Sequence, residues 1–162
     1  MGVDVLGDAA VSMFARRGVG CVWQDYHVLA LRKGRWTLLG GGSSSGEEEL
    51  LADRPAVLPA SSAMWRGAGI GPAPGVLVVE GSGGVRDGGA DPRPWPWSGR
   101  WISYATVRVA ADVAAVRIAD RLLPVPWHGR VVVAWGERRP PRVTALDECG
   151  RSLGEALLPS TR

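Results

Sequence analysis

The clearest pattern in the sequence is a series of short apolar runs in its C-terminal half. Six strand-like runs follow one another from residue 101 onward, separated by turn signals such as His128-Gly129 and Pro140-Pro141. Runs of this length at this spacing are typical of antiparallel sandwiches and barrels. The runs cover residues 101–109, 113–119, 121–127, 130–135, 142–147 and 151–157.

Alternation within these runs predicts which side chains form a core. Successive side chains of a strand point to opposite faces, so Val131, Val133 and Trp135 share one face. The same rule assigns a second set of side chains to the solvent face. The predicted core contains Val116, Ile118, Val131, Val133, Trp135 and Val143. The predicted outward side chains are Arg108, Arg117, Arg142 and Thr144.

The first 18 residues are interpreted as an N-terminal arm or a short helix over 8–17. Asp8 is a suitable N-cap, the alanines that follow favour a helix, and Gly18 suits a helix C-terminus. Ten residues alone form a marginal helix, so we expect this one to dock on the rest of the protein.

Residues 19–40 predict a meander of three short strands at 19–24, 27–32 and 35–40. Asp25-Tyr26 is expected to form the first turn, and Lys33-Gly34 the second, a two-residue hairpin. Residues 41–99 are predicted to be rich in loops, with one strand at 75–81 and a short acidic helical turn, capped by a serine of 43–45, before residue 54.

Composition supports this picture of one all-β domain, with a β-sandwich core at 100–158. The chain has 162 residues, enough for a single domain, and its 23 Gly and 12 Pro argue against a helix bundle. We therefore predict an antiparallel β-sandwich with long Gly/Pro-rich loops and a single short N-terminal helix at most. Cys21 and Cys149 are expected to be free thiols, and two Cys with two His disfavour a structural zinc site.

No apolar run is long enough to cross a bilayer, and the start of the chain lacks the basic flank of a secretory signal. These features predict a cytoplasmic protein without a membrane span. The formal net charge of +3 is small for a dedicated nucleic-acid duplex binder.

Residues 100–158 resemble a small Ig-like β-sandwich module found in uncharacterised proteins of high-GC actinobacteria. The resemblance is carried by Asp112–Val116, Pro124–Gly129, Val131–Val133 and the closing hairpin Val143–Leu153. It implies an Ig-like arrangement of the sandwich. Because these motifs are turn and strand chemistry, they imply no activity, cofactor or site residue.

Two glycine-rich motifs could carry chemistry. Residues 42–46 match G-x-S-x-G, which would make Ser44 a nucleophile with His128 as its base. The alternating strand–helix pattern of hydrolases is absent, however. Glu47 and the two glutamates after it would also place three negative charges beside a developing oxyanion, where hydrogen-bond donors are needed. Those glutamates also disfavour a phosphate loop at Gly41–Gly46, so we expect no catalytic residue and no cofactor.

The eight Trp residues are the strongest anomaly in the composition. Those at 23, 36, 127 and 135 fall within or at the ends of predicted strands, where we expect them to pack in the core. A second group lies in the segment 93–101, where prolines would hold the chain extended. The candidate binding residues of this segment are Arg93, Trp95, Trp97, Arg100 and Trp101.

The sequence supports one leading function and two alternatives. The leading hypothesis is a non-enzymatic module that binds another protein, because no coherent catalytic set is present. The first alternative is binding of carbohydrate or single-stranded nucleic acid through the Trp/Arg segment 93–101. The second is a serine hydrolase that uses Ser44. The segment could also fold back over a sheet edge and play a purely structural role.

Overall fold

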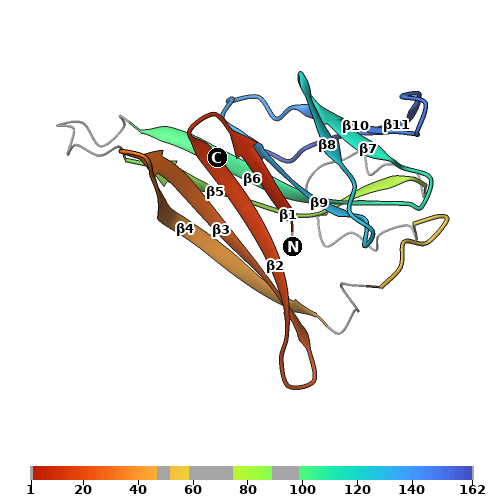
Figure 1. Cartoon of the computed structure of the whole chain (residues 1–162), viewed down its shortest axis with the longest axis horizontal. Coiled ribbons are helices and arrows are strands. Elements are labelled where there is room, and N and C mark those ends of the chain that lie inside the picture. The colour runs from red at the N-terminus through yellow and green to blue at the C-terminus, as the bar shows by residue number, and fades with distance from the viewer. Residues whose placement is uncertain (1, 47–51, 59–74, 89–98, 162) are drawn as a thin grey trace.

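A computed structural model describes residues 2–46, 52–58, 75–88 and 99–161. Within these ranges the protein has eleven β-strands and no helix, which confirms the predicted all-β class (Figure 1). The same part of the chain accordingly holds no helix that could span a membrane.

The strands form three antiparallel sheets. The N-terminal sheet has the order β1-β2-β3-β4, with bounds Gly2–Leu6, Ala9–Arg17, Val22–Arg32 and Arg35–Gly46. The central sheet has the order β5-β6-β9, with bounds Leu77–Asp87, Arg100–Val109 and Arg130–Trp135. The C-terminal sheet has the order β11-β10-β7-β8, with bounds Ser152–Leu157, Arg142–Leu146, Ala115–Ile118 and Arg121–Pro124.

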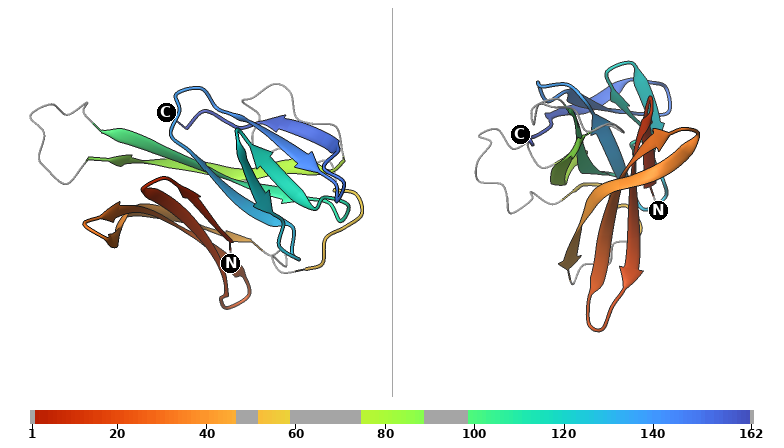
Figure 2. Two further views of the ribbon diagram at one scale, coloured as in Figure 1. Left: turned by 45° about the horizontal axis from the view of Figure 1, so that its top comes forward. Right: turned by 90° about the vertical axis from the view of Figure 1, so that its left-hand side faces the viewer.

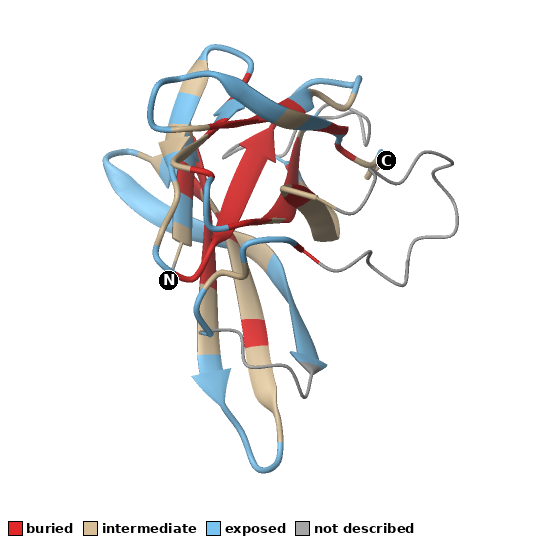
Figure 3. Cartoon of the chain, turned by 90° about the vertical axis from the view of Figure 1, so that its right-hand side faces the viewer, coloured by how far each residue is buried: buried red, intermediate tan, exposed pale blue. Residues whose placement is uncertain are grey.

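The central sheet packs against both other sheets, so that two apolar cores share it (Figure 2). Alternate residues of β6 divide between the cores: Val107 packs with the C-terminal sheet, and Ile102 with the N-terminal sheet. Strand β9 divides in the same way, and all its residues are buried. Figure 3 shows the buried residues gathered in the middle of the molecule, with exposed hairpins at its periphery.

The predicted core of the C-terminal half is confirmed. All six of its side chains belong to the core between the central and C-terminal sheets. Two of the predicted outward residues, Arg117 and Arg142, are exposed, whereas Arg108 is half-buried and ion-paired. Thr144 faces the same side as its cross-strand partners Arg117 and Glu155, as predicted, but it is buried, and its hydroxyl lies against Glu155 of β11.

The predicted N-terminal helix is wrong, because residues 9–17 form strand β2. This strand pairs along its whole length with β3 and along half of it with β1. The neighbours satisfy the backbone hydrogen bonds that a helix would have made internally. Ala9, Val11 and Met13 then alternate onto the core beneath, so tertiary packing overrides the helix propensity of the alanines.

The three-strand meander at 19–40 is also wrong in detail. Strand β3 runs without interruption through the expected turn at Asp25-Tyr26, and β4 continues to Gly46. Residues 43–45, expected to cap a helix, therefore lie in a strand, while 47–51 fall outside the described residues. The hairpin turn at Lys33-Gly34 is confirmed, and both residues have positive φ, 49° and 78°.

The strand expected at 75–81 is present but longer, since β5 continues to Asp87 through residues interpreted as loop. Its glycines explain the extension, because they leave room for large rings from β6. A Cβ at Gly83 would clash with the Tyr104 ring, and one at Gly84 with the Trp101 indole. Glycine here serves close packing between neighbouring strands rather than chain flexibility.

Candidate functional site

Of the five predicted binding residues, the structure places only Arg100 and Trp101, which begin strand β6. Arg93, Trp95 and Trp97 lie outside the described residues. The binding hypothesis for the segment 93–101 can therefore be compared with the structure only at its C-terminal end.

Both of these placed side chains form contacts within the chain itself. The Arg100 guanidinium forms an ion pair with Asp8, and its hydrogen bond holds the pKa of that carboxyl below its usual range. The Trp101 indole lies over Gly84, and its Nε1 donates to Thr161 Oγ1 at 3.1 Å. These contacts tie the start of β6 to the turn between β1 and β2, to β5 and to the C-terminal segment.

The four strand tryptophans do not all enter the core as expected. Only Trp135 is buried, at 4 % exposure, whereas Trp36 and Trp127 are 46 % and 59 % exposed. Trp23 is half-buried beneath the Arg16 guanidinium, which lies 5.1 Å from the ring centroid. Trp23 lies on β3 and Trp36 on β4, and both side chains contribute to the outer face of the N-terminal sheet.

The residues of the hydrolase hypothesis are not assembled for catalysis. Ser44 lies opposite Gln24 within strand β4, not on the sharp strand-to-helix turn of a nucleophile elbow. His128 is buried before β9, and its Nδ1 accepts the backbone N–H of Arg130 at 3.2 Å. Burial lowers the pKa of His128. No hydrogen bond joins Ser44 to His128 in the structure.

The cysteines are both free thiols, Cys21 half-exposed and Cys149 exposed, as the sequence predicts. Within the described ranges, no three side chains of His, Cys, Asp or Glu gather as metal ligands do.

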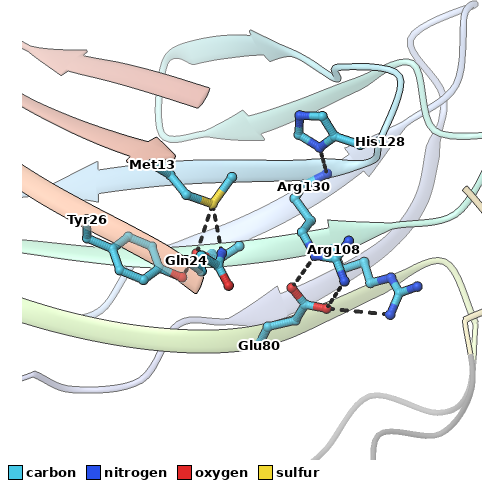
Figure 4. A network of polar contacts seen from close by, with 8 residues as sticks. Met13, Gln24, Tyr26, Glu80, Arg108, His128 and Arg130 are labelled. Atoms are coloured by element: carbon cyan, nitrogen blue, oxygen red, sulfur yellow. Dashed lines mark hydrogen bonds and ion pairs between the residues drawn. The ribbon is translucent and has the colours of Figure 1, made fainter. Parts of the chain in front are cut away.

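A buried ion-pair cluster crosses the central sheet (Figure 4). Arg130 Nε and Nη2 lie 3.0 and 3.4 Å from the two carboxylate oxygens of Glu80, and Arg108 Nη1 lies 3.6 Å from one of them. The two arginines are direct partners in the β6–β9 register, so a carboxylate between them offsets the repulsion of like charges. Glu80 therefore links all three strands of this sheet electrostatically.

Next to this cluster, polar side chains bridge the N-terminal and central sheets. Tyr26 and Thr106 share a hydrogen bond of 2.7 Å between their oxygens, and the Gln24 amide lies 2.8 Å from Met13 Sδ. The Tyr26 ring stacks on Tyr104, with centroids 5.2 Å apart. Burial raises the pKa of Tyr26 to about 12, so its phenol stays protonated at neutral pH. This is an internal network without a reactive group.

The outer face of the N-terminal sheet carries several exposed apolar side chains. One row crosses all four strands, because Val5 pairs with Ala10, Ala10 with Leu29, and Leu29 with Leu38. Directly paired residues share a face, so these four side chains lie in one row, in which Ala10 is buried and Leu29 half-buried. Its ends, Val5 and Leu38, are 49 % and 59 % exposed. We call this set the apolar row.

Other side chains extend the apolar row on both sides. Leu31 and Trp36 form the next cross-strand pair, and both are exposed. On the opposite side lies Val3, and beyond it the Phe14 and His27 rings meet at 5.4 Å between centroids. The outer face is thus apolar over its middle and one end.

Polar side chains bound this apolar region towards the far end of the sheet. The Asp25 carboxylate accepts hydrogen bonds from Ser43 Oγ and from Arg16 Nε, and both lower its pKa. At the hairpin end, Lys33 and Arg35 are exposed beside Trp36.

Sequence reasoning missed this surface because it depends on the pairing of four strands. The alternation Val3-Asp4-Val5 was the available signal, but it is too short to be told from an arm. The Leu29–Leu38 pair follows from the register of the Lys33-Gly34 hairpin, but Val5 and Ala10 join it only through the pairing of β1 and β2 with β3.

No family model matches the sequence, and the comparisons with curated proteins and with solved structures gave no match.

Proposed function

We propose that this protein is a non-enzymatic interaction module that binds another protein through the outer face of its N-terminal sheet. The observation that carries the proposal is the apolar row with its exposed neighbours Leu31 and Trp36. Exposed apolar side chains gathered on one face mark interaction sites on soluble proteins.

The chemistry of this face favours a protein over a sugar or a nucleic acid. Its middle is aliphatic, from Val5 to Leu38, and aliphatic side chains supply neither stacking planes nor hydrogen bonds for sugars or bases. An apolar centre with an aromatic side chain and a polar rim is the usual anatomy of a protein interface. The exposed Lys33 and Arg35 beside Trp36 favour a partner with an acidic rim.

The test places a photo-crosslinking amino acid at Val5 or, as control, at Leu122, which is also exposed and lies on strand β8 of the C-terminal sheet. Species crosslinked only from Val5 in the native host are identified, and the purified partner is titrated against the protein by calorimetry. We expect Val5→Glu combined with Leu31→Glu to weaken binding at least about 100-fold, because two charges would be buried. Leu122→Glu should leave the affinity unchanged.

Two outcomes would contradict the proposal. One is equal binding by the Val5→Glu/Leu31→Glu variant and the wild-type protein. The other is saturable binding of a glycan or an oligonucleotide that this same double variant abolishes, which would reassign the face to the other ligand class.

A further inference from the structure

Arg16 is exposed on the outer face of the N-terminal sheet, yet two contacts fix its guanidinium group. Its Nε donates to Asp25 Oδ2 at 2.6 Å, and the group lies over the Trp23 ring, 5.1 Å from the centroid. Both contacts come from β3, where Trp23 is the direct cross-strand partner of Arg16 and Asp25 follows on the same face. The side chain is 58 % exposed, but these contacts have already removed much of its rotamer freedom.

The carboxylate that orients Arg16 is itself held in place. Asp25 is 19 % exposed and accepts a second hydrogen bond from Ser43 Oγ, which lies opposite it on β4. The hydrogen bonds from Ser43 and Arg16 lower the pKa of Asp25, so this carboxylate stays ionised at neutral pH. Residues of three neighbouring strands therefore determine the position of one guanidinium group.

The terminal edge of Arg16 remains available to a ligand. Arg16 uses Nε for Asp25, and neither of its Nη groups forms a hydrogen bond within the described part of the chain. Two adjacent Nη groups match the two oxygens of a carboxylate, which a guanidinium binds in a planar, bidentate geometry. Because the group is oriented before binding, it loses little conformational entropy when it binds.

We propose that Arg16 binds a carboxylate of the partner protein and so helps to determine which partners the outer face accepts. This inference rests on the function proposed above and names the chemistry of one contact in it. A carboxylate is favoured over a phosphate, because the Asp25 charge beside Arg16 would repel the additional negative charge of a phosphate. Arg and Trp, which meet here, are also the residue types that most often dominate the binding energy of protein interfaces.

The test titrates the partner crosslinked from Val5 against variants of the full chain by calorimetry. Arg16→Gln should weaken binding about 30-fold, the range expected for a hydrogen-bonded charge pair. Arg16→Lys should weaken it about 10-fold, because lysine keeps the charge but lacks the planar pair of donors. Arg17→Gln is the matched control: it removes the same charge from the next residue of β2, which points to the other face, and should change the affinity less than about threefold.

The effect of Asp25 separates the orientation of Arg16 from the overall charge of the face. Asp25→Ala removes a negative charge opposite an acidic partner, so charge attraction alone predicts tighter binding. If Asp25 orients Arg16, the same change should weaken binding about 10-fold. Tighter or unchanged binding would overturn the proposal. Should Asp25→Ala fail to fold, Ser43→Ala removes one support of this carboxylate and should weaken binding in the same direction.

A double-mutant cycle locates the carboxylate on the partner. Each Asp and Glu of the partner's interface is changed to its amide, and one of these changes should lose its effect in the Arg16→Gln background. Binding that is weakened by Val5→Glu/Leu31→Glu but not by Arg16→Gln would overturn this inference and leave the proposed function standing. If no partner is captured from Val5, both fail. Coupling of Arg16 to a phosphorylated residue, lost after phosphatase treatment, would overturn the choice of a carboxylate.

Discussion

Among single residues, Asp4 has a buried carboxylate whose contacts connect all three sheets. Its side chain is 1 % exposed, lies on β1, and contacts Arg121 of β8 and the Ala134 backbone of β9. A buried charge is tolerated only when it is paired and hydrogen-bonded, and both conditions are met here. The residue therefore positions β1 at the edge of the central sheet.

Removal of this carboxylate should destabilise the fold strongly. Asp4→Ala leaves Arg121 without its ion-pair partner and the Ala134 N–H without an acceptor. We expect a loss of about 3 kcal/mol in the free energy of unfolding, the lower end for a broken buried pair, because Arg121 is 22 % exposed. Urea denaturation measures it, with the exposed Asp120→Ala as control. Equal losses in the two variants would contradict the role assigned to Asp4.

His128 gives the protein a pH-dependent stability. Its pKa is lowered by burial, so the unfolded chain binds the proton more readily than the folded one. Stability is therefore highest above the ordinary histidine pKa of about 6.5 and falls as the pH drops below it. We expect denaturant midpoints to fall between pH 7.5 and 5.5, and His128→Gln to reduce that fall.

The control for this measurement is His27→Gln on the outer face. The pKa values of Asp8, Asp25 and Asp147 are lowered below that of a free aspartate, so those carboxylates stay ionised in this pH window. A pH dependence that persists in full in His128→Gln would show that another group is responsible.

Among the elements, β9 is the strand on which both cores depend. Its odd-numbered residues, Val131, Val133 and Trp135, face the C-terminal sheet, while Val132 and Ala134 face the N-terminal sheet. A strand with two buried faces needs apolar residues throughout, which explains its nearly continuous apolar sequence.

The contrast between two tryptophans tests this arrangement. Trp135→Ala should cost about 3–5 kcal/mol of unfolding free energy, because a large buried side chain is lost and leaves a cavity. Trp127→Ala removes the same side chain from an exposed position and should change stability by less than about 1 kcal/mol. Thermal and denaturant unfolding compare the two, and equal losses would show that the burial of β9 is misjudged.

At the scale of the whole molecule, the shared central sheet makes the three sheets interdependent. Ile102, Tyr104 and Val132 are buried only because the N-terminal sheet covers them. Without this cover, the central sheet would expose an apolar face to water, at a cost proportional to the area exposed.

A truncated chain tests this dependence. A fragment of residues 75–162, which lacks β1–β4, should bind a hydrophobic dye and lose the cooperative thermal transition of the full chain. Circular dichroism and dye fluorescence measure both properties. A fragment that melts cooperatively at the temperature of the full chain would contradict the interdependence of the sheets.

Local patterns were sufficient in the C-terminal half. Its strands are short, separated by strong turn residues, and the alternation of Val131, Val133 and Trp135 identifies their buried face without knowledge of the partners. The Lys33-Gly34 hairpin was predicted for a similar reason, since a two-residue turn between apolar runs has few alternatives. Each of these features depends on residues close together in the sequence.

The candidate site, in contrast, was decided by the tertiary structure. The alanines of β2 favour a helix in isolation, and the glycines and serines of β4 favour a loop; only pairing with β1 and β3 makes them strands. The sequence by itself determined the all-β class, the C-terminal core and one hairpin, because local periodicity sets the buried face of each strand. Only the tertiary structure decided the full N-terminal sheet and its apolar row, because β1, β2 and the second half of β4 become strands only through pairing with their neighbours.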